Sequence, residues 1–389
     1  MRICQIITRL IVGGAQENTL LTCEGLHQRG HDVLLLAGPE TGPEGSLHDR
    51  ASGGGYAFEL VDSLRRQVSP IRDRACRTEL VQRLRAWRPD VVHTHSSKAG
   101  VVGRFAARDA RVPLILHTVH GMSFNRTQSA LQRRLFAAVE RRCATFTDRI
   151  ISVADAMTEQ CLAARVGLPE QFCTIYSGIE VDPFDPGRYD AQAVRRDWDL
   201  DGDVIIVGTI ARLFANKGYE QLMAAMRLAV ARDDRLRFVW VGGGAWQERY
   251  EAELRLTGLA ERVVITGLVP PVEIPRLIAG MDMLVHASQW EGLPRAVVQA
   301  LLMARPAISF DIDGAPEVII PDQTGELVPF NDVQALADAI VRLANDPDRR
   351  ARYGQAGRQQ CLDRFDHHRM VNQIEAVYTS LSERGTARG

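Results

Sequence analysis

The chain has 389 residues, of which 46% are hydrophobic and 24% charged, and its formal net charge at pH 7 is −1. Such a balance gives no reason to expect nucleic acid as a partner, because nucleic-acid-binding proteins present a dominant cationic surface. The seven cysteines are scattered without a CxxC pair, so we expect neither a disulfide framework nor a zinc site. This pattern favours a protein of the reducing cytoplasm. The length fits two domains of about 180 residues better than one.

The N-terminal apolar run, MRICQIITRLIVGG, is short and interrupted, unlike a signal peptide. No segment reaches the roughly 18–20 apolar residues that a membrane span needs. We therefore expect a soluble, cytoplasmic protein.

In the first half, short β-branched runs alternate with amphipathic stretches. Strands are predicted at 2–7, 31–37, 56–61, 90–95, 113–118 and 149–153, and helices near 15–29, 73–87, 98–109, 128–146 and 155–165. Apolar runs separated by helices are typical of parallel strands buried on both faces.

The pattern restarts after SGIEVDPFDPGRYD (177–190), a Pro- and Gly-rich segment typical of a linker. Strands are predicted at 203–210, 237–243, 262–267, 283–288 and 306–311, and helices near 217–231, 245–256, 272–279, 294–303 and 331–344. We predict an α/β protein with two doubly wound domains, 1–185 and 186–365, facing a central cleft at their strand ends. A last amphipathic helix within 366–389 is expected to pack across the domain junction.

Two cations stand out in IARLFANKGYEQL (210–222), where a strand leads through a loop into a helix. Lys217 is one of two lysines in the chain, the other being Lys98, and Arg212 precedes it in the same loop. A helix N-terminus offers N–H groups and a partial positive charge, and a guanidinium with an ammonium makes this a diphosphate site. The alternative is a pair of ordinary surface cations.

A second polar loop, EGLP, follows the predicted strand 283–288 and leads into a helix beginning near Pro294. The carboxylate of Glu291 can accept hydrogen bonds from sugar hydroxyls, and N–H groups of residues 292–295 can bind the same hydroxyls or a phosphate. Gln299 lies about two helical turns further on. Alternatively, Glu291 only complements the helix dipole.

Two glycine-rich loops also join strands to helices, one at Gly13 and Gly14 and one at 242–244. Neither has the full G-x-G-x-x-G spacing, so a nicotinamide or flavin dehydrogenase is not expected. Each can be a phosphate loop or only a tight turn.

At the end of the predicted strand 113–118, LHTVHG contains His117 and His120. Strand alternation points the two rings to different sides, so only one is expected to face a ligand, and we choose His120, nearer the strand end. The sequence DID (311–313) spells a metal-binding Asp-x-Asp, but it ends a strand before GAPEVI, where a helix with Pro at its head is expected. We interpret it as a turn and expect no metal.

The order GGAQ, HTVHG, ARLFANKG, VGGG, ITG, EGLPRAVVQA and GAPEVI resembles the family-4 retaining glycosyltransferases of GT-B fold, and the resemblance covers essentially the whole chain. It implies that Arg212 and Lys217 bind the donor diphosphate and that Glu291 holds donor-sugar hydroxyls. It also implies that His120 approaches the sugar. The remaining residues that it implies in donor binding are Gly13, Gly14, Gly243, Leu268, Gly292, Leu293, Pro294, Arg295 and Gln299.

One departure concerns Gln299, where the family usually has a second Glu that contacts the ribose. An amide oxygen still accepts hydrogen bonds, although more weakly, so we expect altered ribose recognition with activity retained. A second departure, Ser177-Gly178 in place of Asn-Gly, has no interpretation.

The resemblance implies a hexosyltransferase of bacterial type that uses a nucleotide sugar, UDP-sugar favoured over GDP-sugar, without metal or cofactor. The acceptor is expected to be lipid-linked or a small molecule, in surface polysaccharide or other glycoconjugate assembly. Arg and Lys slightly exceed Asp and Glu in residues 1–185, mild support for peripheral contact with the inner face of the membrane. The alternatives are an epimerase of the same architecture and a non-catalytic sugar-nucleotide-binding regulator; a phosphorylase-type enzyme fits poorly because neither lysine suits a cofactor Schiff base. Oligomeric state is left open.

Overall fold

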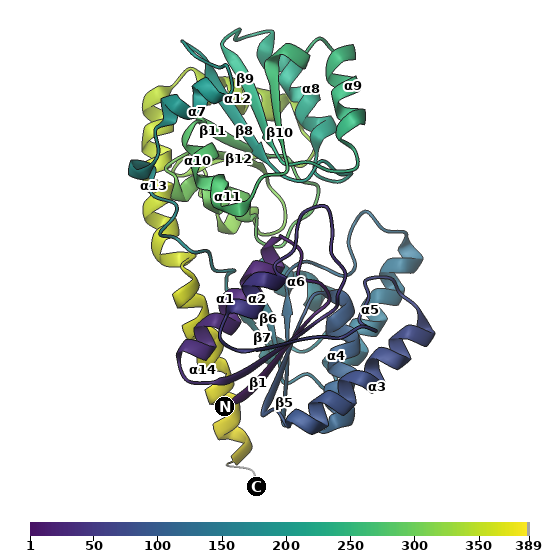
Figure 1. The fold of residues 1–389 in the computed structure, drawn as a ribbon. Coiled ribbons are helices and arrows are strands. Elements are labelled where there is room, and N and C mark those ends of the chain that lie inside the picture. The colour runs from purple at the N-terminus through teal and green to yellow at the C-terminus, as the bar shows by residue number, and fades with distance from the viewer. Residues whose placement is uncertain (387–389) are drawn as a thin grey trace. The chain divides into compact units, whose positions relative to one another are not determined.

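In this computed structural model, residues 1–386 are described and form two compact units (Figure 1). The first unit comprises Met1–Ile179 together with the C-terminal helix α14 (His367–Thr386), and the second comprises Glu180–Asp366. The chain thus passes between the units near residue 180, six residues before the predicted start of the second domain.

The first unit is built on a seven-stranded parallel sheet with the order β3-β2-β1-β4-β5-β6-β7. Its strands are β1 (Arg2–Ile7), β2 (Asp32–Ala37), β3 (Ala57–Leu60), β4 (Val91–His95), β5 (Leu114–Val119), β6 (Arg149–Ser152) and β7 (Phe172–Thr174). Its other helices are α1 (Gly14–Gln28), α2 (His48–Gly53), α3 (Pro70–Trp87), α4 (Ser97–Ala110), α5 (Ala130–Ala144) and α6 (Asp155–Ala163), with a short 3-10 helix at Pro169–Gln171.

Alternate residues of the central strand β1 enter different hydrophobic cores. Ile3 and Ile7 lie in a core with residues of α1 and α14, whereas Cys4 and Ile6 lie in a core with residues of α3 and α4. Both faces of the sheet are therefore covered, which explains why its strands read as unbroken apolar runs.

Helix α14 packs beside α1 within the first unit (Figure 1). Val371 meets Gly25 of α1 so closely that a Cβ there would lie 2.8 Å from the valine side chain. At the helix surface, Glu375 accepts hydrogen bonds from Arg29 at 2.7 Å and lies 2.8 Å from His31. The last helix is therefore part of the first unit's core; that it also crosses a domain junction stays a prediction.

The second unit has a six-stranded parallel sheet with the order β10-β9-β8-β11-β12-β13. Its strands are β8 (Ile205–Ile210), β9 (Leu236–Val241), β10 (Val263–Gly267), β11 (Met283–His286), β12 (Ala307–Phe310) and β13 (Gly325–Val328). Its helices are α7 (Ala191–Asp197), α8 (Tyr219–Val230), α9 (Gln247–Leu256), α10 (Ile274–Ala279), α11 (Arg295–Leu302), α12 (Val333–Ala344) and α13 (Pro347–Arg364), with 3-10 turns at Pro186–Arg188, Ala260–Arg262, Pro271–Glu273 and Ala315–Glu317.

The predicted fold class, two doubly wound parallel-sheet domains, is confirmed. The structure adds elements that the sequence pattern did not reveal, namely β7, β13, α2, α7 and α13. It also corrects GAPEVI, where a longer helix was expected: only the three-residue 3-10 helix Ala315–Glu317 forms.

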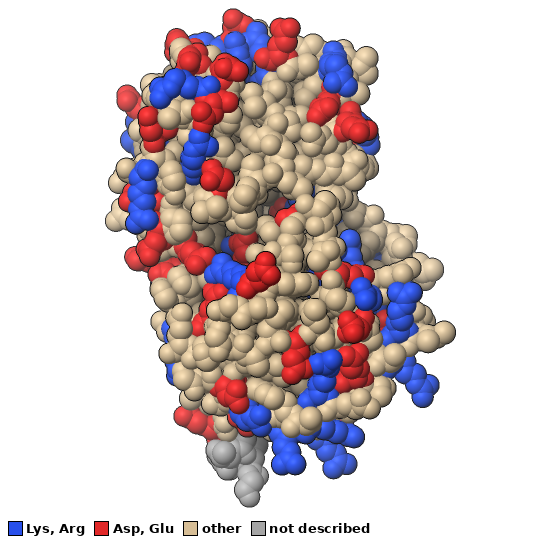
Figure 2. Space-filling model, viewed as in Figure 1, with Lys and Arg blue, Asp and Glu red and all other residues tan. Residues whose placement is uncertain are grey.

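Charges of both signs are interspersed over the face of the molecule in Figure 2, as the near-zero net charge leads one to expect. Within residues 1–386, no helix is both long enough and apolar enough to cross a membrane.

Candidate active site

The loop 211–218, between β8 and α8, is fixed to the carboxyl edge of the second sheet. The Tyr219 hydroxyl donates to the carbonyl of Ala211 at 2.9 Å, and the Leu213 N–H donates to the carbonyl of Gly243 at 3.0 Å. The glycine-rich loop 242–244 thus supports loop 211–218, which carries both predicted phosphate-binding cations. This contact explains the tight turn at 242–244 without a phosphate bound to that turn.

Gly218 brings the end of this loop against β11. It has a φ of 77°, and a Cβ at this position would lie 1.7 Å from the carbonyl oxygen of Ala287. Only glycine combines this left-handed conformation with so close a backbone approach. Lys217, one residue earlier, is therefore held beside the residues that follow β11.

Lys217 and Glu291 form an ion pair, with Nζ 2.6 Å from Oε1. Nζ also donates to the Ser288 hydroxyl at 3.4 Å, and His286 places Nε2 3.3 Å from Oε1 of Glu291. The two charged side chains are 25% and 21% exposed, so both remain reachable by a ligand. The structure thus joins the two predicted polar loops into one cluster.

Burial alone would raise the pKa of Glu291, but the neighbouring Lys217 ammonium and His286 outweigh burial and hold that pKa far below its usual range. Glu291 is therefore an anion at neutral pH. In that state it accepts hydrogen bonds and has no proton to donate, which suits the holding of sugar hydroxyls and excludes a role as general acid.

Asp313 holds the Glu291 loop from the neighbouring strand end. Its Oδ2 accepts the N–H of Glu291 at 2.8 Å, and the next residue, Gly314, donates to the carbonyl of Gly292 at 3.2 Å. The DID segment is a turn as predicted, with Asp313 in the left-handed region at φ 49°. Sequence reasoning missed this positioning role, although a carboxylate three positions after β12 could have indicated it.

The residues after Glu291 lie at the start of α11, which begins at Arg295, one position later than the predicted start near Pro294. Gly292, Leu293 and Pro294 are buried, while Arg295 and Gln299 are half-buried. The prediction that the N–H groups of residues 292–295 bind a ligand is wrong for Pro294, because proline has no N–H.

The remaining predicted residues of the second unit lie on adjacent loops. Arg212 is exposed, with its guanidinium carbon 5.0 Å from the centre of the Phe214 ring. Leu268, 46% exposed after β10, packs against Gly243, where a Cβ would lie 3.1 Å from the leucine side chain. These positions leave the two residues available to a ligand at the same sheet edge.

In the first unit, Gly13 and Gly14 begin α1 after the loop that follows β1, which is the predicted strand–loop–helix arrangement. Gly13 is the residue before the helix, and its carbonyl accepts the N–H of Glu17 at 3.0 Å.

His120 stands at the end of a buried hydrogen-bonded chain, which we call the histidine network. His120 Nε2 lies 3.0 Å from His95 Nδ1, and His95 Nε2 lies 2.7 Å from Oε1 of Gln5. Gln5 Nε2 donates to the Tyr378 hydroxyl at 3.0 Å, and that hydroxyl lies 2.6 Å from His93 Nδ1. The chain ends where His93 Nε2 lies 2.7 Å from the Thr118 hydroxyl.

The amide of Gln5 sets the direction of this network. Its oxygen can only accept, so His95 carries its proton on Nε2 and accepts from His120 at Nδ1. Burial lowers the pKa of His93 to about 3, with a smaller contribution from His120, and it holds the pKa of His95 well below the usual range. His93 and His95 are therefore neutral at pH 7, and His120 donates to His95 from Nε2.

His117 lies on the opposite face of the sheet from His120. Its Nδ1 is 2.9 Å from the Thr94 hydroxyl, and the ring fills the space beside Gly100 of α4. Sequence reasoning distinguished the two rings but missed the other members of the network. The alternation of two histidines in DVVHTH was the available signal, because it places His93 and His95 on one face of a buried strand.

Within residues 1–386, one group of imidazole and carboxylate ligands, the consecutive Asp366, His367 and His368, is close enough to share an ion, with ligand atoms within 4.8 Å of one another. It includes no member of the histidine network and no residue of the Glu291 loop.

Comparison with known proteins accounts for both halves of the chain. Residues 13–178 match the family model described as Glycosyl transferase 4-like domain, and residues 190–360 match Glycosyl transferases group 1. A similar protein is the UDP-Gal:alpha-D-GlcNAc-diphosphoundecaprenol alpha-1,3-galactosyltransferase of Escherichia coli, 26% identical over 388 residues, 98% of this chain and 97% of the relative. A GDP-mannose-dependent alpha-mannosyltransferase of Mycobacterium tuberculosis is 27% identical over 358 residues, 91% of this chain and 89% of the relative.

Among solved structures, HepE of Anabaena in complex with UDP superposes with a TM-score of 0.83 at 21% identity, over 98% of this chain and 100% of that chain. Sucrose-phosphate synthase of Thermosynechococcus elongatus superposes with a TM-score of 0.82 at 22% identity, over 99% and 100%. The fold and the polar sheet edges, with these relatives, define a glycosyltransferase of GT-B fold. The chain belongs to the family-4 glycosyltransferases, the group 1 glycosyl transferases.

Proposed function

We propose that the protein transfers a sugar from a nucleoside diphosphate sugar to an acceptor hydroxyl, with retention of anomeric configuration and without metal. UDP-sugar is the proposed donor, in preference to GDP-sugar, and the pathway is polysaccharide or other glycoconjugate assembly at the inner face of the membrane. The pairing of Lys217 with an ionised Glu291 carries this proposal, because it sets a cation for phosphate beside an anion for sugar hydroxyls. The galactosyltransferase relative and the complexes of HepE with UDP support the donor.

In the proposed reaction, the bond between the anomeric carbon and the diphosphate oxygen breaks, and negative charge develops on the diphosphate. Lys217, Arg212 and the N–H groups at the helix starts after these loops stabilise that charge as preorganised electrostatics. Because the loops are already fixed to the sheet edge, little reorganisation is needed when the charge forms. These cations supply the role that a divalent metal would otherwise fill.

The acceptor oxygen bonds to the anomeric carbon on the face that the leaving group vacates, and its proton passes to the departing phosphate oxygen. This route needs no carboxylate base, which agrees with Glu291 serving as a hydrogen-bond acceptor. In the first unit, His120 approaches the donor sugar, with its Nε2 held by His95.

Saturation-transfer NMR with UDP-, GDP- and ADP-sugars tests the donor site. We compare wild type with Lys217→Ala and with Arg227→Ala, which removes an exposed cation from helix α8. We expect a UDP-sugar signal that Lys217→Ala loses and Arg227→Ala keeps. Equal signals from all three proteins would remove Lys217 from the phosphate site, and a GDP-sugar response alone would overturn the proposed donor.

A further inference from the structure

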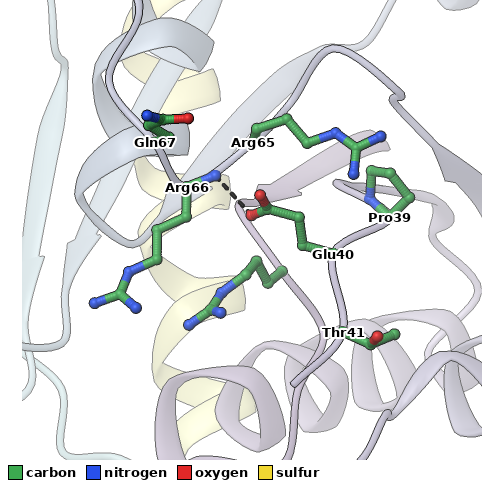
Figure 3. Close-up of a pocket in the computed structure, with 7 residues that line it drawn as sticks. Pro39, Glu40, Thr41, Arg65, Arg66 and Gln67 are labelled. Carbon is green, nitrogen blue, oxygen red and sulfur yellow. Dashed lines mark hydrogen bonds between the residues drawn. The ribbon is translucent and has the colours of Figure 1, made fainter. Parts of the chain in front are cut away.

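Three loops of the first unit line an open hollow of about 660 Å³ that belongs to neither polar cluster described above (Figure 3). They follow β1, β2 and β3, so the hollow lies at the carboxyl edge of these parallel strands, where doubly wound sheets bind ligands. The residues lining it are Arg9, Pro39, Glu40, Thr41, Arg65, Arg66 and Gln67.

The hollow has more positive than negative charge. Three arginines line it against one carboxylate, Glu40, whose Oε2 accepts the backbone N–H of Arg66 at 2.7 Å. In Figure 3, Glu40 lies between the side chains of Arg65 and Arg66, which extend in different directions. Arg65 donates from Nε to the carbonyl of Asp62 at 2.9 Å, and neither guanidinium forms an ion pair within residues 1–386. Two planar guanidinium groups without ion-pair partners among the described residues are suited to binding phosphate oxygens.

The loop that carries these arginines is held in place before any ligand arrives. A Cβ on Gly38, after β2, would lie 2.0 Å from the carbonyl oxygen of Leu64, so the two loops touch through their backbones. Lys98, the second lysine of the chain, donates to the carbonyl of Gln67 at 3.1 Å and also pairs with Asp73. A prearranged cationic loop loses less conformational freedom on binding than a mobile one.

Apolar side chains are exposed directly after the arginines. Val68 is 69% exposed and Ile71 is 85% exposed, and both follow Arg66 within five positions. A cationic hollow next to exposed apolar side chains matches a ligand whose anionic group adjoins a hydrocarbon chain.

We propose that this hollow binds the diphosphate of a lipid-linked acceptor, with Arg65 and Arg66 on the phosphate oxygens and with Val68 and Ile71 against the lipid chain. The inference rests on the proposed function, since it assigns the acceptor's anionic group to the first unit while the donor's diphosphate is bound by Lys217 in the second. It names the acceptor class as a diphosphate-linked lipid.

The test titrates inorganic pyrophosphate into the full-length protein by calorimetry. All proteins carry Lys217→Ala, so that binding at the donor site is weakened to the same extent in each of them. One variant adds Arg65→Gln and Arg66→Gln; its matched control adds Arg72→Gln and Arg74→Gln, which remove the same charge from exposed positions of α3 outside the hollow. We expect the Kd for pyrophosphate to rise about tenfold or more in the first and to stay within about twofold in the second. Equal Kd values in the two variants would overturn the proposal.

Vesicle flotation separates the two sources of phosphate, with vesicles containing either a polyprenyl diphosphate or phosphatidylglycerol at equal charge. The Arg65→Gln/Arg66→Gln change is expected to reduce binding to the first and to spare binding to the second. Equal loss on both vesicles would mean an anionic bilayer as the ligand and would overturn the acceptor assignment.

Nucleotide-sugar binding by NMR, measured on the same double variant with Lys217 restored, distinguishes this proposal from the proposed function. Retained nucleotide binding with weakened pyrophosphate binding supports both. If wild type binds no nucleotide sugar, the proposed function fails by itself and the acceptor assignment falls with it, even if the hollow binds pyrophosphate.

Discussion

The Glu291 loop of the second unit and the end of β4 and β5 in the first unit both gather polar side chains at the carboxyl edge of a parallel sheet. In the second unit the group is charged and partly exposed, with Lys217 Nζ 2.6 Å from Glu291 Oε1. In the first unit, His93 and His95 of the histidine network are buried and neutral, because burial lowers their pKa values. The cluster in the second unit is therefore charged, whereas the buried part of the histidine network in the first unit is neutral.

The difference also appears in how each group is assembled. The charged group lies on loops, which residues such as Gly218 and Asp313 fix by backbone contacts. Apart from His120, which directly follows β5, the histidine network lies on strand positions and on α14, so that the sheet and its covering helix hold it directly. Loss of charge should therefore impair turnover in the second unit, whereas loss of one polar atom should impair stability in the first.

The largest expected effect is on turnover. Lys217→Ala removes the cation that we propose stabilises the leaving diphosphate, and we expect kcat to fall on the order of 10²–10³-fold, about 3–4 kcal/mol. Steady-state kinetics with the donor identified by NMR measure it. Arg227→Ala, which removes charge from exposed α8, serves as the control.

The Lys217–Glu291 pair makes a sharper form of this prediction. The double variant Lys217→Ala/Glu291→Ala should lose less activity than the sum of the two single losses in free energy, because each single variant leaves a charge without its partner. Additive losses would show that the two residues act separately.

The second expected effect is a difference in acid sensitivity between the units. The pKa of His93 is lowered to about 3 in the folded chain, so below about pH 6.5 the unfolded chain binds a proton that the folded chain does not. Stability therefore falls as pH falls, by about 2 kcal/mol from His93 between pH 7 and pH 5. His95 and His117 shift in the same direction.

Glu291 affects stability in a lower pH range. Its folded pKa is depressed, so its contribution to stability is complete above the ordinary pKa of a glutamate, about 4.3, and is lost only at lower pH. Hydrogen exchange at pH 7 and pH 5 should show weakened protection in β4 and β5 and unchanged protection in β8 and β11. His93→Gln should reduce the pH dependence, whereas the exposed-site control His368→Gln should keep it. An equal loss of exchange protection in both sheets would contradict the expected difference in acid sensitivity between the two units.

Most of the architecture could be predicted because buried parallel strands leave apolar runs that need no partner to be recognised. The elements that escaped are short or polar: β7 has three residues, and α13 is a polar helix with few buried positions. In both cases the tertiary packing around the segment, absent from its local pattern, decides its conformation.

The candidate site divides in the same way. Lys217 and Glu291 could be chosen because charge next to a strand–loop–helix boundary has a chemical meaning by itself. Their partner Asp313 could not be chosen in this way. The pairing of Gln5 with Tyr378 could not be predicted either, because these residues are separated by 373 positions and meet only because α14 covers the first sheet. A residue that acts through another residue leaves no local pattern of its own.

The third expected effect tests the neutral network. Tyr378→Phe leaves Gln5 Nε2 and His93 Nδ1 without the hydroxyl that joins them, and we expect a loss of about 1–3 kcal/mol in the free energy of unfolding. Tyr56→Phe is a matched control in the same core, because the Tyr56 hydroxyl is buried without a hydrogen bond to any described residue. Denaturant unfolding of both variants measures the difference. Equal losses would mean that packing of the ring, and not the network, sets the stability.

The smallest expected effect concerns Asp313, which supports the charged group from outside. Asp313→Ala removes the acceptor of the Glu291 N–H, and a loss of about 1 kcal/mol should raise the donor KM about fivefold with little change in kcat. Asp313→Asn keeps an acceptor oxygen and should retain most of the affinity. A metal-binding Asp-x-Asp would behave differently, because an amide is a poor substitute for a metal-ligating carboxylate: activity would then fall as far with Asn as with Ala, and added divalent cation would change it. Near-normal kinetics of Asp313→Asn beside a raised KM of Asp313→Ala would therefore assign the DID turn to holding the Glu291 backbone, and would leave the charge on the leaving diphosphate to Lys217 and its neighbours.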